Sequence, residues 1–143
     1  MIAALVGESG AGRRWLVACG RDRRLRVCPA ALQRGKYSKC IHVLHNSAEK
    51  ALEAVILAER KRPPRGAGGH NLVRLHAMVA RQAKLSPRLV RTLDDLSPLY
   101  LPSEYPDGAL GAPGTLFKKE QAQRYLREVG ELVRWLKRRM SRD

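Results

Sequence analysis

Apolar residues recur every three or four positions along most of this chain, which is the spacing of amphipathic helices. The clearest apolar stripe consists of Tyr37, Ile41, Leu44, Ala48, Ala51, Leu52 and Val55. The pattern predicts helices at residues 13–32, 37–60, 70–84, 87–96 and 116–139. No stretch has the strict alternation of a half-buried strand, and no segment is repeated. We therefore expect an all-α protein, an up-and-down helical bundle of about five helices.

Proline and glycine mark where these helices should stop. Pro29 lacks a backbone donor and is expected to kink or end the first helix. The loop at 61–69, with two prolines and three glycines, should end the second. Ser86 followed by Pro87 is typical of a helix start. Residues 97–115 are rich in proline and glycine, which predicts an irregular loop.

The length of 143 residues fits one domain of ordinary size. We expect residues 1–12 to form a flexible N-terminal tail and residues 13–143 to form a single helical domain. The apolar run at residues 1–6 is too short to cross a membrane and lacks the basic start of a signal peptide. These features predict a cytoplasmic protein without a membrane anchor.

The chain is strongly basic, with 28 Lys and Arg residues against 13 Asp and Glu residues and a formal net charge of +15. Such a balance favours a polyanionic partner, which means nucleic acid, a nucleotide or an acidic protein. The alternative is that the excess charge is only solvated. The densest basic loop holds Arg60, Lys61, Arg62 and Arg65. Those side chains should meet phosphates as a broad surface.

Cysteine and histidine usage gives no sign of a metal site. Three cysteines without a Cys-x-x-Cys spacing predict small buried thiols in a reducing compartment, and neither a disulfide framework nor structural zinc. His42 and His45 share a helix face, but no third ligand has diagnostic spacing. We therefore expect no metal and no cofactor.

Several segments follow one another in an order typical of a known family. They read, in chain order, RRWLVACGRD, NSAEKALEA, PPRGAGGHNLVRL and LYLPSEYPDG. Over about residues 14–140 this order resembles the HEPN family, the higher eukaryotes and prokaryotes nucleotide-binding domain. The resemblance implies a HEPN-like helical bundle. It also implies a homodimer, and often a minimal nucleotidyltransferase as partner.

Two departures from the family pattern bear on activity. Ribonuclease members of the family carry Arg, four to six residues and then His on a late helix, whereas the last histidine here is His76. The family's arginine before Tyr-Pro is replaced by Glu104, ahead of Tyr105. The resemblance therefore implies a module without catalytic activity that binds nucleotide or nucleic acid. The candidate contacts are Lys50, Arg60, Arg62, Arg65, His70 and Tyr105.

Two other functions stay open. An endoribonuclease toxin of a toxin–antitoxin pair would use His70 as general acid or base, with Arg65 holding the scissile phosphate. A protein-interaction module would use its charge only for solubility or for an acidic partner.

The candidate residues also have purely structural interpretations. His70 would cap or pack the start of the third helix while Arg65 stays solvated, and Tyr105 would pack its loop onto the bundle. Glu49 and Lys50 would be ordinary surface charges that pair along the helix.

Overall fold

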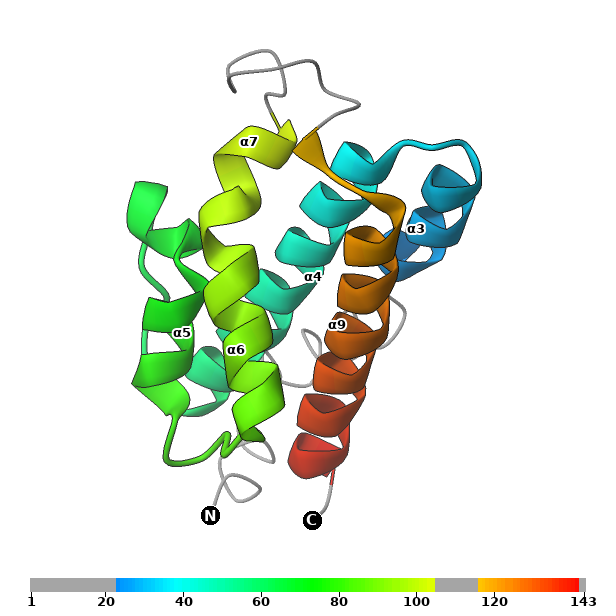
Figure 1. The fold of residues 1–143 in the computed structure, drawn as a ribbon. Helices are drawn as coiled ribbons and strands as arrows, with labels where there is room; N and C mark the ends of the chain where they lie inside the picture. Colours follow the sequence, from blue (N-terminus) through cyan, green and yellow to red (C-terminus); the bar gives the residue numbers. More distant parts are fainter. Residues whose placement is uncertain (1–22, 105–115, 142–143) are drawn as a thin grey trace.

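The computed structural model describes residues 23–104 and 116–141, and within them it is helical, without strands (Figure 1). The α-helices are α3 (Arg23–Gln33), α4 (Tyr37–Ala58), α5 (Leu72–Val79), α6 (Pro87–Leu96), α7 (Tyr100–Glu104) and α9 (Lys119–Ser141). Two short 3-10 turns, η1 (Gly66–His70) and η2 (Ser97–Leu99), precede α5 and α7. The expected all-α helical bundle is confirmed.

Helix α4 is the centre of the bundle and packs against α3, α5, α7 and α9. Figure 1 shows α5 and α6 on one side of it and α3 and α9 on the other. Its apolar residues Ile41, Leu44, Leu52 and Ile56 are fully buried. Burial of each such side chain stabilises the fold by about 1.5–3 kcal/mol. Because α4 is enclosed on several sides, some of its polar residues are buried as well, among them His45 and Glu49.

The end of α4 directs the chain into the basic loop. Arg60 has a φ of 58°, in the left-handed region that usually favours glycine. Its amide donates to the carbonyl of Leu57, and the amide of Lys61 donates to that of Ile56. This is the Schellman arrangement that satisfies the last carbonyls of a helix. The loop therefore leaves α4 in a fixed direction.

Residues 97–104 are helical, so the prediction of an irregular loop is wrong for them. Figure 1 shows α6, η2 and α7 as one nearly continuous column beside α4. Pro98 and Pro102 are accommodated because each lies in the first turn of its element, where backbone donors need no partner. Residues 105–115 of the expected loop lie outside the described part of the chain.

The ends of two further helices can be compared with the prediction. Helix α3 ends at Gln33, next to the predicted end at residue 32, so Pro29 does not end it. Helix α5 stops at Val79, earlier than expected, and Lys61 Nζ donates to the carbonyl of Met78 in its last turn. The expected start at Ser86 is confirmed, since its side chain accepts from the amide of Leu89.

The cysteine prediction is wrong in one respect. Cys28 on α3 and Cys40 on α4 are both fully buried, as expected, but they form a disulfide with their Cα atoms 4.7 Å apart. The short turn through Gly35, with a φ of 69°, folds α3 back onto α4 and brings the two residues together. Sequence spacing alone cannot show such a tertiary contact. Cys19 lies outside the described residues.

Candidate functional site

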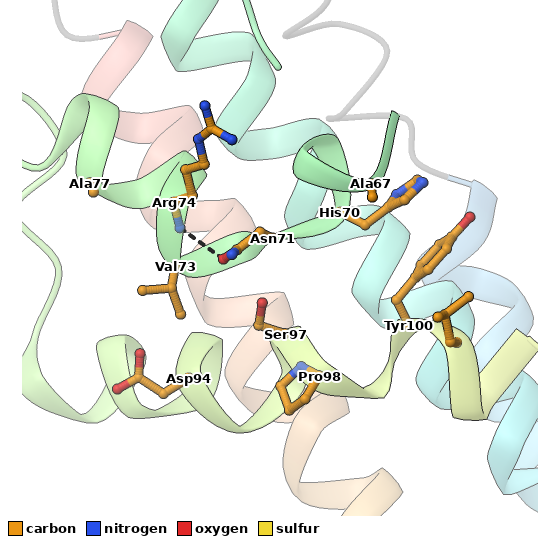
Figure 2. A pocket seen from close by; sticks show the side chains of 11 residues that line it. Ala67, His70, Asn71, Val73, Arg74, Ala77, Asp94, Ser97, Pro98 and Tyr100 are labelled. Carbon is orange, nitrogen blue, oxygen red and sulfur yellow. Dashed lines mark hydrogen bonds between the residues drawn. The ribbon is translucent and has the colours of Figure 1, made fainter. Parts of the chain in front are cut away.

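The elements η1, α5, α6, η2 and α7 line a cavity of about 850 Å³ that is open to solvent (Figure 2). Its lining residues are Ala67, His70, Asn71, Val73, Arg74, Ala77, Asp94, Ser97, Pro98, Tyr100 and Leu101. Most of the wall is apolar, with a few polar groups between the aliphatic side chains. This composition is typical of small-molecule binding sites.

Two stacked rings form one wall of the cavity. His70 comes from the end of η1 and Tyr100 from the start of α7, and their ring centroids lie 3.7 Å apart at an interplanar angle of 10°. Figure 2 shows the two rings side by side. The rings of His42 and His45 lie 5.5 and 5.2 Å from the Tyr100 ring. One tyrosine therefore contacts three histidines from two elements.

Glu49 on α4 holds His70 in place. Its Oε2 lies 3.0 Å from His70 Nδ1, and the carboxylate is buried while the imidazole is about one third exposed. Burial raises the pKa of Glu49, and the hydrogen bond from His70 partly opposes that shift. Because Nδ1 is engaged with Glu49, Nε2 is the ring nitrogen left for a ligand.

His45 lies behind this pair, with its ring completely buried. Its Nδ1 is 3.7 Å from Glu49 Oε2, and neither ring nitrogen makes a hydrogen bond of ordinary geometry. Burial lowers the pKa of His45 to about 4, although backbone groups of Ser97 and His70 partly oppose the shift. The imidazole is therefore neutral near pH 7.

Two glycines allow the loop before His70 to pack as it does. A Cβ at Gly69 would lie 2.8 Å from the backbone oxygen of Pro64. A Cβ at Gly68 would lie 2.9 Å from the guanidinium of Arg74. Only glycine permits such close approaches without movement. The sequence Pro-Pro-Arg-Gly-Ala-Gly-Gly thus places His70 over Glu49.

The polar groups of the cavity are partly engaged by the backbone. Asn71 caps α5 by accepting from the amide of Arg74, and Ser97 Oγ accepts from the amide of Leu72, each at 3.0 Å. The Asn71 amide group and the Ser97 hydroxyl still have hydrogens to donate. Asp94 and Arg74 contribute one charge of each sign.

Of the six residues predicted to bind a ligand, His70 is the one that lines this cavity. Arg65 is exposed and flanks η1, two residues before Ala67. Arg60 and Arg62 are exposed in the same loop, while Lys50 pairs with Glu53 at 3.0 Å. Tyr105 lies outside the described residues.

The sequence interpretation of Glu49 as a surface charge is wrong, because its side chain is buried. His70 does not cap α5 either, since Asn71 fills that position. The sequence did contain a signal for the first of these corrections, the burial of Glu49. His45 and Glu49 are four residues apart and occupy positions on the stripe with Ile41 and Leu52, where a buried residue is expected.

Among the residues that the structure describes, no three His, Cys, Asp or Glu side chains are grouped so as to hold a metal ion. Within the same ranges, no helix is long and apolar enough to cross a membrane.

Comparisons with known proteins agree with this architecture. The model of the HEPN domain family matches residues 22–139. The crystal structure of TT1696 from Thermus thermophilus is similar with a TM-score of 0.75 and 22% sequence identity. The match covers 92% of this chain and 99% of that one. A likeness at this identity shows the fold alone. No curated protein sequence matches this chain.

Proposed function

This chain belongs to the HEPN domain family, and from that premise we propose that it is a binding module for nucleotide or nucleic acid. The family membership supports a nucleotide-binding or ribonuclease-like module in general terms. We place the ligand in the cavity beside His70 and Tyr100. The observation that carries this proposal is the stacked ring pair on the wall of an apolar cavity. Nucleobases bind proteins largely by stacking on such rings.

Charge near the cavity supports the same proposal. Arg74 lines the cavity, and Arg65 lies two residues before the lining residue Ala67. Two residues span at most about 7 Å of backbone, so Arg65 belongs to the edge of the site. Both side chains are exposed. They are suited to contact phosphate oxygens, and the chain's net charge of +15 favours approach of a polyanion.

The proposal is tested by the salt dependence of binding to a labelled single-stranded RNA. Each phosphate contact contributes a slope of about −0.7 in log affinity against log salt for single strands. Arg65→Ala and Arg74→Ala should each lower the affinity and flatten the slope. Arg127→Ala is the matched control, because Arg127 lines a different cavity between α3 and α9. Absence of binding, or equal effects of all three substitutions, would contradict the proposal.

One observation favours a second candidate, the endoribonuclease. His70 is held by the buried carboxylate of Glu49, an arrangement that orients a general base or acid. The partner of His70 is Glu49, and the side chain of Arg65 is exposed. Incubation of end-labelled RNA in EDTA with wild type and His70→Ala separates the two candidates. Cleavage by the wild type alone supports the enzyme, and a mobility shift without cleavage supports the binding module.

We also propose a homodimer that pairs with a minimal nucleotidyltransferase, as the family resemblance implies. Light scattering on the purified protein tests the first part, and co-purification of the two proteins tests the second. A stoichiometric complex with an acidic protein, together with no affinity for RNA or nucleotides, would instead support a protein-interaction module.

A further inference from the structure

We infer that the cavity takes one unpaired base of a single-stranded nucleic acid while the phosphates stay outside it, along a basic rim formed by Arg62, Arg65 and Arg74. This inference rests on the proposed function and narrows its ligand. It places the base, rather than the phosphates of a free nucleotide, inside the protein. A nucleoside triphosphate is then a poor ligand.

The first argument is the charge of the cavity. Arg74 and Asp94 are its charged lining residues, so its formal charge is zero when histidine is counted as neutral. The whole chain carries +15. Sites that hold a triphosphate use lysine, magnesium and a run of backbone amides. No lysine lines this cavity, and the described residues hold no acidic cluster for a metal. A neutral base suits it better.

The second argument is where the cations lie. The guanidinium of Arg74 lies against η1 at Gly68, and Figure 2 shows it pointing away from Ser97 and Pro98. Arg65 flanks the start of η1, and Arg62 is exposed three residues earlier. The charges of Arg74 and Arg65 therefore lie at the η1 edge of the cavity, and we assign Arg62 to the same rim because it lies three residues before Arg65. A strand whose backbone follows that edge keeps its phosphates in water and beside these cations.

The third argument is exposed apolar surface. Val27, Val73 and Leu101 are the large hydrophobic residues exposed in the described ranges, and the last two line this cavity at 45% and 62% exposure. Large aliphatic side chains gathered at one opening are typical of a binding surface. Together with the parts of the stacked His70–Tyr100 pair that face the cavity, they offer contacts for a base. Asp94 can accept a hydrogen bond from the polar edge of the base, while Asn71 and Ser97 can donate hydrogen bonds to that edge.

The test compares two strands that differ only in their bases. One is a single-stranded oligonucleotide of about eight nucleotides, and the other is an abasic strand with the same number of phosphates. Binding is measured by fluorescence anisotropy, in RNA and in DNA forms. We expect the abasic strand to bind about tenfold more weakly or worse. Weaker binding of the abasic strand, whether in the RNA or in the DNA form, supports the inference.

Surface variants locate the effect without disturbing the core. Leu101→Ser and Val73→Ser should each reduce the preference for the base-containing strand severalfold. Val27→Ser on α3 is the matched control, since it removes a similarly exposed valine away from the cavity, and it should leave the preference unchanged. Arg74→Ala should weaken the binding of the base-containing strand and of the abasic strand to the same extent. An equal effect of Val27→Ser and Val73→Ser would overturn the assignment.

Competition completes the test. A free nucleoside triphosphate should displace the oligonucleotide no better than the corresponding monophosphate. If the triphosphate binds more tightly than the oligonucleotide, or if the abasic strand binds as well as the complete one, the inference fails while the proposed binding function stands. If neither strands nor nucleotides bind, both fail.

Discussion

Two polar regions of this molecule use similar residues in opposite surroundings. The buried cluster consists of His45, Glu49, His70 and Tyr100. The ion-pair face joins α6 to α9 through Arg88 with Glu131 and Arg124 with Asp95. Side chains of these ion pairs are about half exposed, whereas His45 and Glu49 are almost completely covered. Solvent screens the exposed pairs, so they contribute little to stability.

Within the buried cluster, His45 and Glu49 have no such solvent to replace a missing partner, whereas His70 is about one third exposed at the cavity wall. A carboxylate, an imidazole without hydrogen bonds and a stacked ring pair must fit one another inside the protein. Such groups change stability strongly when altered, because a buried polar atom left without a partner is costly. They also mark the place where perturbed pKa values and a cavity coincide, which is typical of functional sites.

The largest expected effect is a pH dependence that comes from His45. Burial lowers its pKa from 6.5 to about 4, so between these values the unfolded chain binds a proton that the native state does not. The stability contributed by the neutral ring is present above pH 6.5 and is lost as the pH falls towards 4, by about 3 kcal/mol. Urea denaturation of wild type and His45→Leu across this range should show the wild type losing stability faster.

Glu49 acts in the opposite direction. Its pKa is raised, so its neutral form stabilises the fold at low pH, and that contribution is lost as the pH rises through its native pKa. Both proteins in the comparison carry Glu49, so the difference between their curves isolates His45. Parallel curves would show that His45 is hydrated in solution, contrary to its buried position.

The second largest effect on stability is expected when the Glu49 carboxylate of the buried cluster is removed. Glu49→Ala leaves His70 Nδ1 without its partner and opens a cavity beside His45, which should lower the free energy of unfolding by about 2–3 kcal/mol. Glu131→Ala on the ion-pair face should cost less than about 1 kcal/mol. Thermal and urea unfolding of both variants make the comparison. Equal losses would mean that burial does not separate the two regions.

The loop that presents His70 can be tested with two adjacent glycines. Gly69→Ala places a Cβ against the backbone oxygen of Pro64, which cannot move aside easily, and should cost about 1–3 kcal/mol. Gly68→Ala meets the flexible end of Arg74 and should cost less than Gly69→Ala. Gly69→Ala should also weaken ligand binding, since η1 carries His70. If Gly68→Ala is the more harmful change, the described loop packing is incorrect.

The smallest change in stability is expected on the ion-pair face, and it should depend on salt. Arg124→Ala removes an exposed partner of Asp95 and should change stability by less than about 1 kcal/mol. That difference should shrink further in about 1 M salt, where the screening length is about 3 Å. Unfolding at low and high salt measures both values. A large loss of stability that persists at high salt would mean that these ion pairs contribute to stability as buried groups do.

The helical bundle could be predicted because the apolar stripes are long and regular. The stripe from Tyr37 to Val55 gives α4 directly, and Ser86 with Pro87 gives the start of α6. Boundaries near prolines were harder to predict. Pro98 and Pro102 suggested a loop, yet both fit first helical turns, where a missing backbone donor costs nothing.

The candidate site could be predicted only in part. The family-like segment and the spacing from Arg65 indicate His70, but its partner Glu49 is 21 residues away on another helix. Tyr100 was treated as a loop residue, and its stacking on His70 depends on how α7 packs against α4. Side chains that meet across elements leave no fixed spacing in the sequence. The polar residues at buried stripe positions were the signal that could have pointed to them.

The most direct test of the binding site is a histidine-resolved NMR titration with a short single-stranded oligonucleotide. His70 lines the cavity, whereas His76 lies outside its lining and its Nε2 is paired with the backbone oxygen of Ala83. We predict that the imidazole signals of His70 move as ligand is added and that those of His76 stay in place. Movement of His76 alone, or binding that leaves His70 unchanged, would contradict the assignment of this cavity as the site.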